Sequence, residues 1–157
     1  MLGLSTSIRN GWREQRGEYI ERLPIPVITN ADRATLETHA RVCQCAAEKR
    51  RDLVEQFDRE VLRDLAPGGW TSKLPGVLQD WTTLDFAGFI AAIKKHFKQD
   101  IPLSDRNGRE AQLKAGVARV AELTTQIKCA EREIDQIVYR LFDLTPDEVI
   151  LIEAAVK

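Results

Sequence analysis

The sequence predicts an all-α protein built on a long antiparallel helical hairpin, and three observations predict it. Two stretches repeat apolar residues at alternating spacings of three and four, the heptad pattern of helices that pack lengthwise in a coiled coil. Each stretch suits a helix of about 35 residues, roughly 50 Å at 1.5 Å per residue. The matched lengths and the short elements between them favour an antiparallel pair within one chain.

The first long helix is expected to begin at an N-cap formed by Thr29 or Asn30 and to run to about Leu65. Thr29 and Asn30 are good N-cap residues, and Asp32 places a negative charge in the first turn, where the helix dipole favours it. Residues 66–69, Ala-Pro-Gly-Gly, end the helix. We define its first seam as Leu36, Ala40, Cys43, Ala47, Arg50, Val54, Phe57 and Val61.

The second long helix carries a similar pattern. We define its second seam as Leu113, Val117, Val120, Thr124, Ile127, Glu131, Ile134, Val138 and Leu141. Because Arg50 and Glu131 each interrupt a seam, we expect them to meet across the pair and set its register. The side chains expected to hold the pair together are Val54, Phe57, Val61, Val120, Ile127, Ile134, Val138 and Leu141.

A connector and a short amphipathic helix separate the long helices. The short helix is expected from about Leu84 to Phe97, with Phe86, Phe89, Ile90, Ile93 and Phe97 on one face. The connector, residues 66–83, carries Trp70 and Trp81. Since long structureless loops are uncommon in compact domains, we expect an ordered cap on one end of the pair.

The two ends of the chain differ. Thr145, Pro146 and Glu148 form a capping box that starts a short C-terminal helix, expected to pack near the other end of the hairpin. Residues 141–144 form the turn before it. At the N-terminus, Pro24 and Pro26 favour extended backbone. We therefore divide the chain into an extended lead-in, residues 1–29, and a helical hairpin domain, residues 30–157.

Composition limits the classes of function. The net charge of the 157 residues is −1 with both signs interspersed, so no overall field attracts nucleic acid or an anionic membrane. Neither a secretory pattern nor a run of about 18 apolar residues occurs, so we expect a cytoplasmic protein. The three cysteines, Cys43, Cys45 and Cys129, are expected to be free buried thiols in a reducing cytosol.

Candidate chemistry has a simpler structural interpretation at each place. Asp147 and Glu148 could belong to a nuclease carboxylate cluster, but the capping box accounts for them. His39 and Cys43 share a helix face and could be half of a zinc site, although a core thiol is favoured. We expect no catalytic residue, no cofactor and no metal, and so no enzyme activity from this chain alone.

Two basic clusters are candidates for contact with DNA. Lys94, Lys95 and Lys98 end the short helix, where cations suit the dipole, so a solvated helix end is favoured over phosphate binding. Arg9, Arg13 and Arg16 are spaced as a basic strip that neighbouring glutamates dilute. Any contact with DNA is therefore expected to be local and weak.

Two segments carry a resemblance to a known family. Residues 19–26, Tyr-Ile-Glu-Arg-Leu-Pro-Ile-Pro, lead into a long helix and resemble the exit from a target-recognition domain in type I specificity subunits and type IIG enzymes. Residues 131–148 include Ile134-Asp135-Gln136-Ile137-Val138-Tyr139 and Leu144-Thr145. This run resembles the C-terminal end of type IIG-like DNA adenine methyltransferases of restriction–modification systems, just before their last short helix.

The resemblance implies a position in a larger system. In that family an (Asn/Asp)-Pro-Pro-(Tyr/Phe) loop holds a flipped adenine, and no two prolines are adjacent here. The chain is therefore expected to be the C-terminal piece or remnant of such an enzyme, a non-catalytic spacer that orients DNA recognition relative to a catalytic core in the same or a neighbouring chain. The alternative is a free-standing interaction or dimerisation module whose seams pair between two chains.

Overall fold

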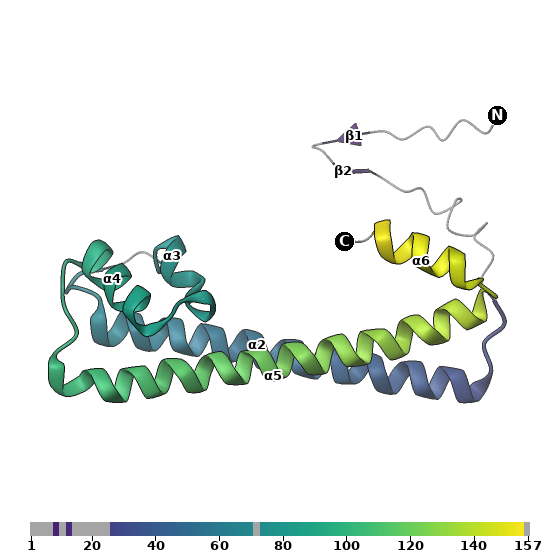
Figure 1. Cartoon of the computed structure of the whole chain (residues 1–157), viewed down its shortest axis with the longest axis horizontal. Helices are drawn as coiled ribbons and strands as arrows, with labels where there is room; N and C mark the ends of the chain where they lie inside the picture. The colour runs from purple at the N-terminus through teal and green to yellow at the C-terminus, as the bar shows by residue number, and fades with distance from the viewer. Residues whose placement is uncertain (1–7, 10–11, 14–25, 71–72, 156–157) are drawn as a thin grey trace. The chain divides into compact units, whose positions relative to one another are not determined.

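A computed structural model describes residues 8–9, 12–13, 26–70 and 73–155. Their elements, in chain order, are β1 (Ile8–Arg9), β2 (Trp12–Arg13), α2 (Asn30–Leu65), α3 (Gly76–Gln79), the 3-10 helix η1 (Trp81–Thr83), α4 (Phe86–Phe97), α5 (Leu103–Leu141) and α6 (Pro146–Ala155) (Figure 1). The expected all-α fold is confirmed. The chain divides into two units, residues 30–138 and residues 1–29 with 139–157, and each is described by itself.

Helices α2 and α5 form the expected antiparallel hairpin within residues 30–138 (Figure 1). Arg50 Nη1 donates to Thr124 Oγ1 at 3.3 Å, and Arg109 Nη2 pairs with Asp64 Oδ2 at 2.5 Å. The step of 14 positions from Arg50 to Asp64 therefore nearly matches the step of 15 positions back from Thr124 to Arg109. The two helices run in opposite directions without a slip in register.

The buried faces of the two helices are wider than the two seams. On α2, Ala46 is buried, whereas Ala40 and Ala47 of the first seam are exposed. On α5, the second seam omits three buried residues at heptad spacing, Leu123, Ala130 and Ile137. Ala46 and Ala47 are neighbours on α2, so a spacing of threes and fours can be drawn through either of them. The first seam uses Ala47, whereas the interface buries Ala46.

The expected meeting of Arg50 with Glu131 is wrong. Arg50 donates to Thr124, one heptad nearer the cap. Burial raises the pKa of the Cys43 thiol, and the charge of nearby Glu131 raises it further. Arg50 of α2 and Glu131 of α5 therefore lie near different residues of the opposite helix, Thr124 and Cys43. The apolar contacts and the closed end of the hairpin set the register instead.

The main core lies where the cap covers one end of the hairpin. Trp81 of η1 is fully buried and stacks on Phe57 of α2, with ring centroids 4.0 Å apart, and Phe89 of α4 meets Phe57 edge-on at 6.1 Å. Trp70 packs against Phe97 with centroids 4.9 Å apart. The expected ordered cap is confirmed, and it joins α2, α4 and α5 in one apolar cluster.

Local capping explains where α4 begins and ends. Asp85 Oδ1 accepts a hydrogen bond from the backbone N–H of Gly88 at 2.7 Å, so the helix begins two residues after the expected Leu84. It ends at Lys98, whose φ of 58° is left-handed and whose N–H bonds the carbonyl of Lys94. The chain can then turn into α5.

The unit that contains residues 139–157 follows the sequence closely. The Leu144 N–H donates to the Tyr139 carbonyl, and the Asp143 N–H donates to the Arg140 carbonyl. Asp143 has a left-handed φ of 51°. Together these features form a Schellman motif, which ends α5. Thr145 N–H then donates to Glu148 Oε2 at 2.8 Å, and Glu148 N–H to Thr145 Oγ1 at 3.4 Å. The capping box that starts α6 is confirmed.

The N-terminal lead-in lies mostly outside the described residues. Of it, β1 and β2 pair antiparallel, Ile8 opposite Arg13 and Arg9 opposite Trp12, and residues 26–29 have no regular secondary structure. Of the two prolines expected to favour extended backbone, Pro24 lies outside the described residues and Pro26 precedes α2 without regular secondary structure.

Gly116 provides the first test of this packing. A Cβ at this position would lie 3.0 Å from Trp81 Cη2 and 3.1 Å from Cζ3. Since Trp81 is fully buried and stacked, it cannot move aside, so Gly116→Ala should destabilise the protein by about 1 kcal/mol despite alanine's better helix propensity. Gly108, also in α5, has nothing within 4 Å of an added Cβ. Gly108→Ala should stabilise by about 0.5–1 kcal/mol. Urea unfolding would measure both, and equal effects would contradict the packing.

Candidate interaction site on the helical hairpin

A continuous groove follows α2 beside the cap, and it is the candidate binding site within residues 30–138. One part, about 480 Å³, lies between α2, η1 and α5, and the other, about 560 Å³, lies between α2 and the connector. Val54, Glu55 and Gln79 line both parts. We call this surface the α2 groove, and its other lining residues are Ala47, Arg50, Arg51, Asp58, Arg59, Leu62, Lys73, Leu74, Thr82, Val120 and Thr124.

Arg50 is the most distinctive residue of the α2 groove. It is half-buried, and its only hydrogen bond among the described residues goes to Thr124, whose own hydroxyl donates to the Val120 carbonyl at 2.8 Å. No described carboxylate lies within ion-pair distance of it. Since a guanidinium carries five N–H donors, most of its donors remain available to an anionic group in the groove.

The remaining charges of the groove partly cancel. Glu55 pairs with Arg51 at 3.9 Å and with Arg59 at 3.7 Å, one turn away on either side. Burial raises the pKa of Asp58, while the Trp81 indole acts in the opposite direction. Asp58 Oδ1 and Trp81 Nε1 are both buried, and neither meets the geometry of a hydrogen bond with a described residue. The groove keeps an excess of positive charge at Arg50 and Lys73.

An ion pair between Asp64 and Arg109 joins α2 to α5 near the cap. Asp64 accepts hydrogen bonds from Arg63 on its own helix and Arg109 on α5, and these bonds, the Arg63 bond first, hold the pKa of its carboxyl well below the ordinary value. One turn away, Gln112 donates to Glu60. Both contacts cross the pair at its closed end.

The candidate DNA-contacting residues are placed in different settings. Lys94 pairs with Asp100 at 2.8 Å, and this bond is the largest cause of the lowered pKa of that carboxyl. Lys95 and Lys98 are exposed at the end of α4. Arg9 and Arg13 lie on β1 and β2, and Arg16 lies outside the described residues. Contact of these residues with DNA stays a prediction.

The residues expected to hold the helix pair are mostly at the interface. Phe57 and Val61 are buried, and the other members within residues 30–138 are half-buried: Val54, Val120, Ile127, Ile134 and Val138. Leu141 is the last residue of α5 and belongs to the other unit.

The cysteines depart from expectation. Cys43 is half-buried with Sγ 3.7 Å from the Ile127 carbonyl oxygen, and burial raises its pKa, which fits the favoured interpretation of a packed thiol. Cys45 and Cys129 are exposed, so the expectation that they are buried is wrong. Cys45 and Cys129 each directly precede a buried alanine, Ala46 or Ala130, and lie beside the contact face of their helix. Over the described part of the chain, no three His, Cys, Asp or Glu side chains gather as metal ligands.

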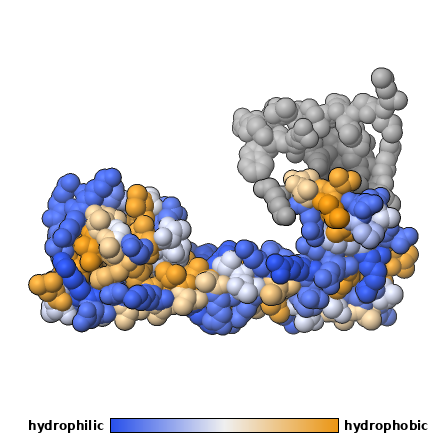
Figure 2. Space-filling model, in the orientation of Figure 1, coloured by the Kyte–Doolittle hydropathy of each residue, from blue (hydrophilic) through white to orange (hydrophobic). Residues whose placement is uncertain are grey.

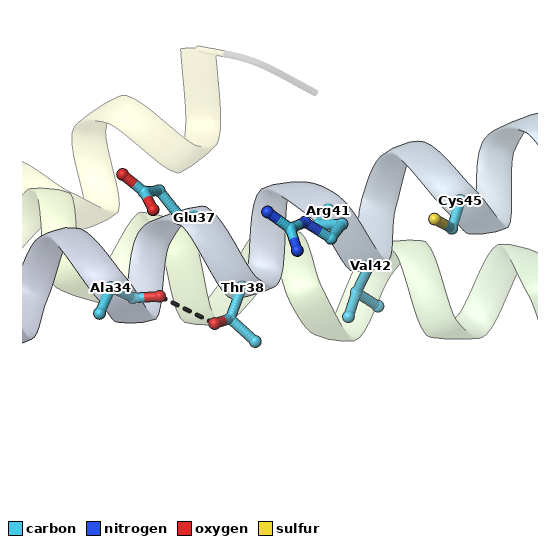
Figure 3. Close-up of a pocket in the computed structure, with 6 residues that line it drawn as sticks. All are labelled: Ala34, Glu37, Thr38, Arg41, Val42 and Cys45. Atoms are coloured by element: carbon cyan, nitrogen blue, oxygen red, sulfur yellow. Dashed lines mark hydrogen bonds between the residues drawn. The ribbon is translucent and has the colours of Figure 1, made fainter.

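A second hollow, about 540 Å³, lies on the first half of α2, and Figure 3 shows six residues that line it: Ala34, Glu37, Thr38, Arg41, Val42 and Cys45. All six belong to one helix. The Thr38 hydroxyl donates to the Ala34 carbonyl of its own helix at 2.8 Å. The polar groups that line this hollow do not converge on a common point, whereas those of the α2 groove surround Arg50. The α2 groove is therefore the stronger candidate.

Comparison with known proteins gives one match. Residues 29–138 match the model of a family described as a domain of unknown function (DUF8810). No curated protein and no solved structure matches the chain. The matched residues correspond to the helical hairpin with its cap. Among the helices of the described residues, none is both long and apolar enough to cross a membrane.

The Asp64 contact makes the stability of the hairpin depend on pH. Because the folded-state pKa is lowered, the stabilisation is complete above the ordinary aspartate pKa of about 3.9 and is lost as pH falls through the lower folded value. Asp64→Asn should therefore cost about 1 kcal/mol at pH 7, and this difference should shrink below about pH 4. Asp52→Asn, which removes an exposed pair with the neighbouring Arg51, is the matched control and should cost less than half as much. Urea unfolding at several pH values measures this; equal losses for both variants would contradict it.

Proposed function

The chain belongs to the DUF8810 family, a domain of unknown function, and we propose that its hairpin is a non-catalytic scaffold of a DNA methyltransferase or restriction–modification specificity module. In this role it holds a DNA-recognition part at a set distance and orientation from a catalytic core. The observation that carries the proposal is the pairing of α2 and α5, 36 and 39 residues long, in one register. A helix of 36 residues is about 54 Å long, a useful length for a spacer.

Stiffness requires that the two helices neither bend apart nor slide. Sliding by one heptad would bring Arg50 to Val117 in one direction and to Glu131 in the other, and either slide would break the Asp64–Arg109 pair. The cap opposes the same movement, because Trp81 contacts Phe57 of α2 and fits over Gly116 of α5. These contacts support a rod whose length is set by the number of heptads.

The setting in DNA modification is supported by the resemblance of residues 131–148 to adenine methyltransferase C-termini. We propose a methyltransferase or restriction core, in the same or a neighbouring chain, as the main partner. With a net charge of −1, the scaffold would contact DNA weakly or indirectly. It would act in the cytoplasm and would need no cofactor of its own.

Co-purification tests the partner. The chain, tagged in its native cells, should bring down a DNA adenine methyltransferase or a specificity subunit in stoichiometric amount, as measured by mass spectrometry. Recovery without such a protein would contradict the proposal. Alone, the purified chain should bind duplex DNA only weakly, with affinity that falls steeply with salt. Tight, sequence-specific binding by the chain alone would make it a recognition domain instead of a spacer.

A paired deletion tests the role of length. Residues 37–43 of α2 face about 131–137 of α5, by extension of the Arg50–Thr124 register. Removing both heptads should leave a folded hairpin shorter by about 10 Å. Methylation of genomic DNA by the partner should then fall at least tenfold. Val42→Ser, which changes an exposed side chain in the same stretch at constant length, is the control and should leave methylation unchanged. Full methylation after the paired deletion would contradict a spacer.

A further inference from the structure

Helix α6 presents aliphatic side chains that the described residues leave exposed. Ile150, Leu151 and Ile152 keep 64%, 69% and 40% of their surface accessible. Hydrophobic residues are visible at the surface of this helix in Figure 2. A run of four aliphatic residues, Val149 to Ile152, gives a helix that is apolar on more than one side. Such helices are ordinarily covered by another element or another molecule.

One face of α6 has a definite chemical pattern. Asp147, Ile150, Leu151 and Ala154 are spaced i, i+3, i+4 and i+7, so they lie along one side of the helix, and all four are exposed. We call this face the acidic–aliphatic stripe. Between residues 146 and 155 the helix has three carboxylates and no lysine or arginine. Because Glu148 is used in the capping box, Asp147 is the first-turn carboxylate that shares a helix face with Ile150 and Leu151.

The α2 groove has the complementary pattern. Arg50 has free N–H donors, and no described carboxylate pairs with it. Beside it, Ala47, Val54 and Val120 offer apolar surface, and all three line the same part of the groove. A carboxylate next to two aliphatic side chains therefore fits this part. A nucleic-acid backbone fits it poorly, because Glu55 and Asp58 lie in the groove and the apolar surface would stay uncovered.

We propose that the α2 groove binds the acidic–aliphatic stripe of α6 from a second copy of the chain. Asp147 would accept hydrogen bonds from the Arg50 guanidinium, and Ile150 and Leu151 would cover Val54 and Val120. Each copy has both surfaces, so the same contact is available in either direction between two copies. In the described structure the two seams pack within one chain, so self-association uses this other surface. The inference does not depend on the scaffold role.

Sedimentation equilibrium of the full chain tests the proposal. From about 1 to 100 µM, the average mass should rise from 17.8 kDa toward twice that value. Asp147→Asn and Leu151→Ser should each raise the dissociation constant at least tenfold. Two matched controls should leave it unchanged: Asp105→Asn, also in the first turn of a helix, and Leu103→Ser, at a leucine that is 79% exposed.

An exchange of charges tests the contact itself. Arg50→Glu and Asp147→Arg should each weaken self-association, and the double variant should recover at least half of the lost binding free energy. Circular dichroism checks that Arg50→Glu still folds, and the two α6 variants carry the test if it does not. A constant mass of 17.8 kDa at all concentrations would overturn the proposal. So would a dimer that Asp147→Asn and Leu151→Ser leave unchanged.

Discussion

The stacking of Trp81 on Phe57, over the backbone of Gly116, is the contact on which the rest of the hairpin depends. Two long helices packed side by side bury only a narrow face and have little core of their own. Trp81, fully buried in the cap, contacts α2 through Phe57 and approaches α5 where Gly116 has no side chain. Burying an aromatic side chain of this size stabilises a fold by about 2–3 kcal/mol. It also fixes which turn of α2 faces which turn of α5.

Beyond the cap, the pair depends on a narrow row of buried residues, Ala46, Leu123, Ala130 and Ile137, and on a few polar contacts. Ala46 and Ala130 are buried there, and small residues let helices approach closely but contribute little apolar area. The Arg50–Thr124 bond lies between the part of the hairpin that the cap covers and the part beyond the cap. A polar pair at this place costs stability relative to well-packed apolar residues. The arrangement favours defined geometry over maximum stability.

Much of the fold could be predicted from the sequence, because its signals are local. Thr145 with Glu148 starts α6 as expected, and residues 66–69 end α2 as expected. What could not be predicted depends on how far one helix is rotated against the other. Ala46 and Ala47 have the same propensity and hydropathy, and only the position of α5 decides which is buried. The partner of Arg50 and the α2 groove also depend on the third dimension, since the groove joins residues from α2, α5 and the connector.

The pairing of the two seams inside one chain can be measured directly with two native thiols. Cys45 lies five residues before Arg50 and Cys129 five residues after Thr124, so the register places these exposed residues opposite each other. With Cys43 replaced by alanine, spin labels on both should give one narrow distance distribution by pulsed electron paramagnetic resonance. Tenfold dilution with unlabelled protein should leave that distribution unchanged. A broad distribution, or a signal that disappears on dilution, would contradict an intramolecular hairpin.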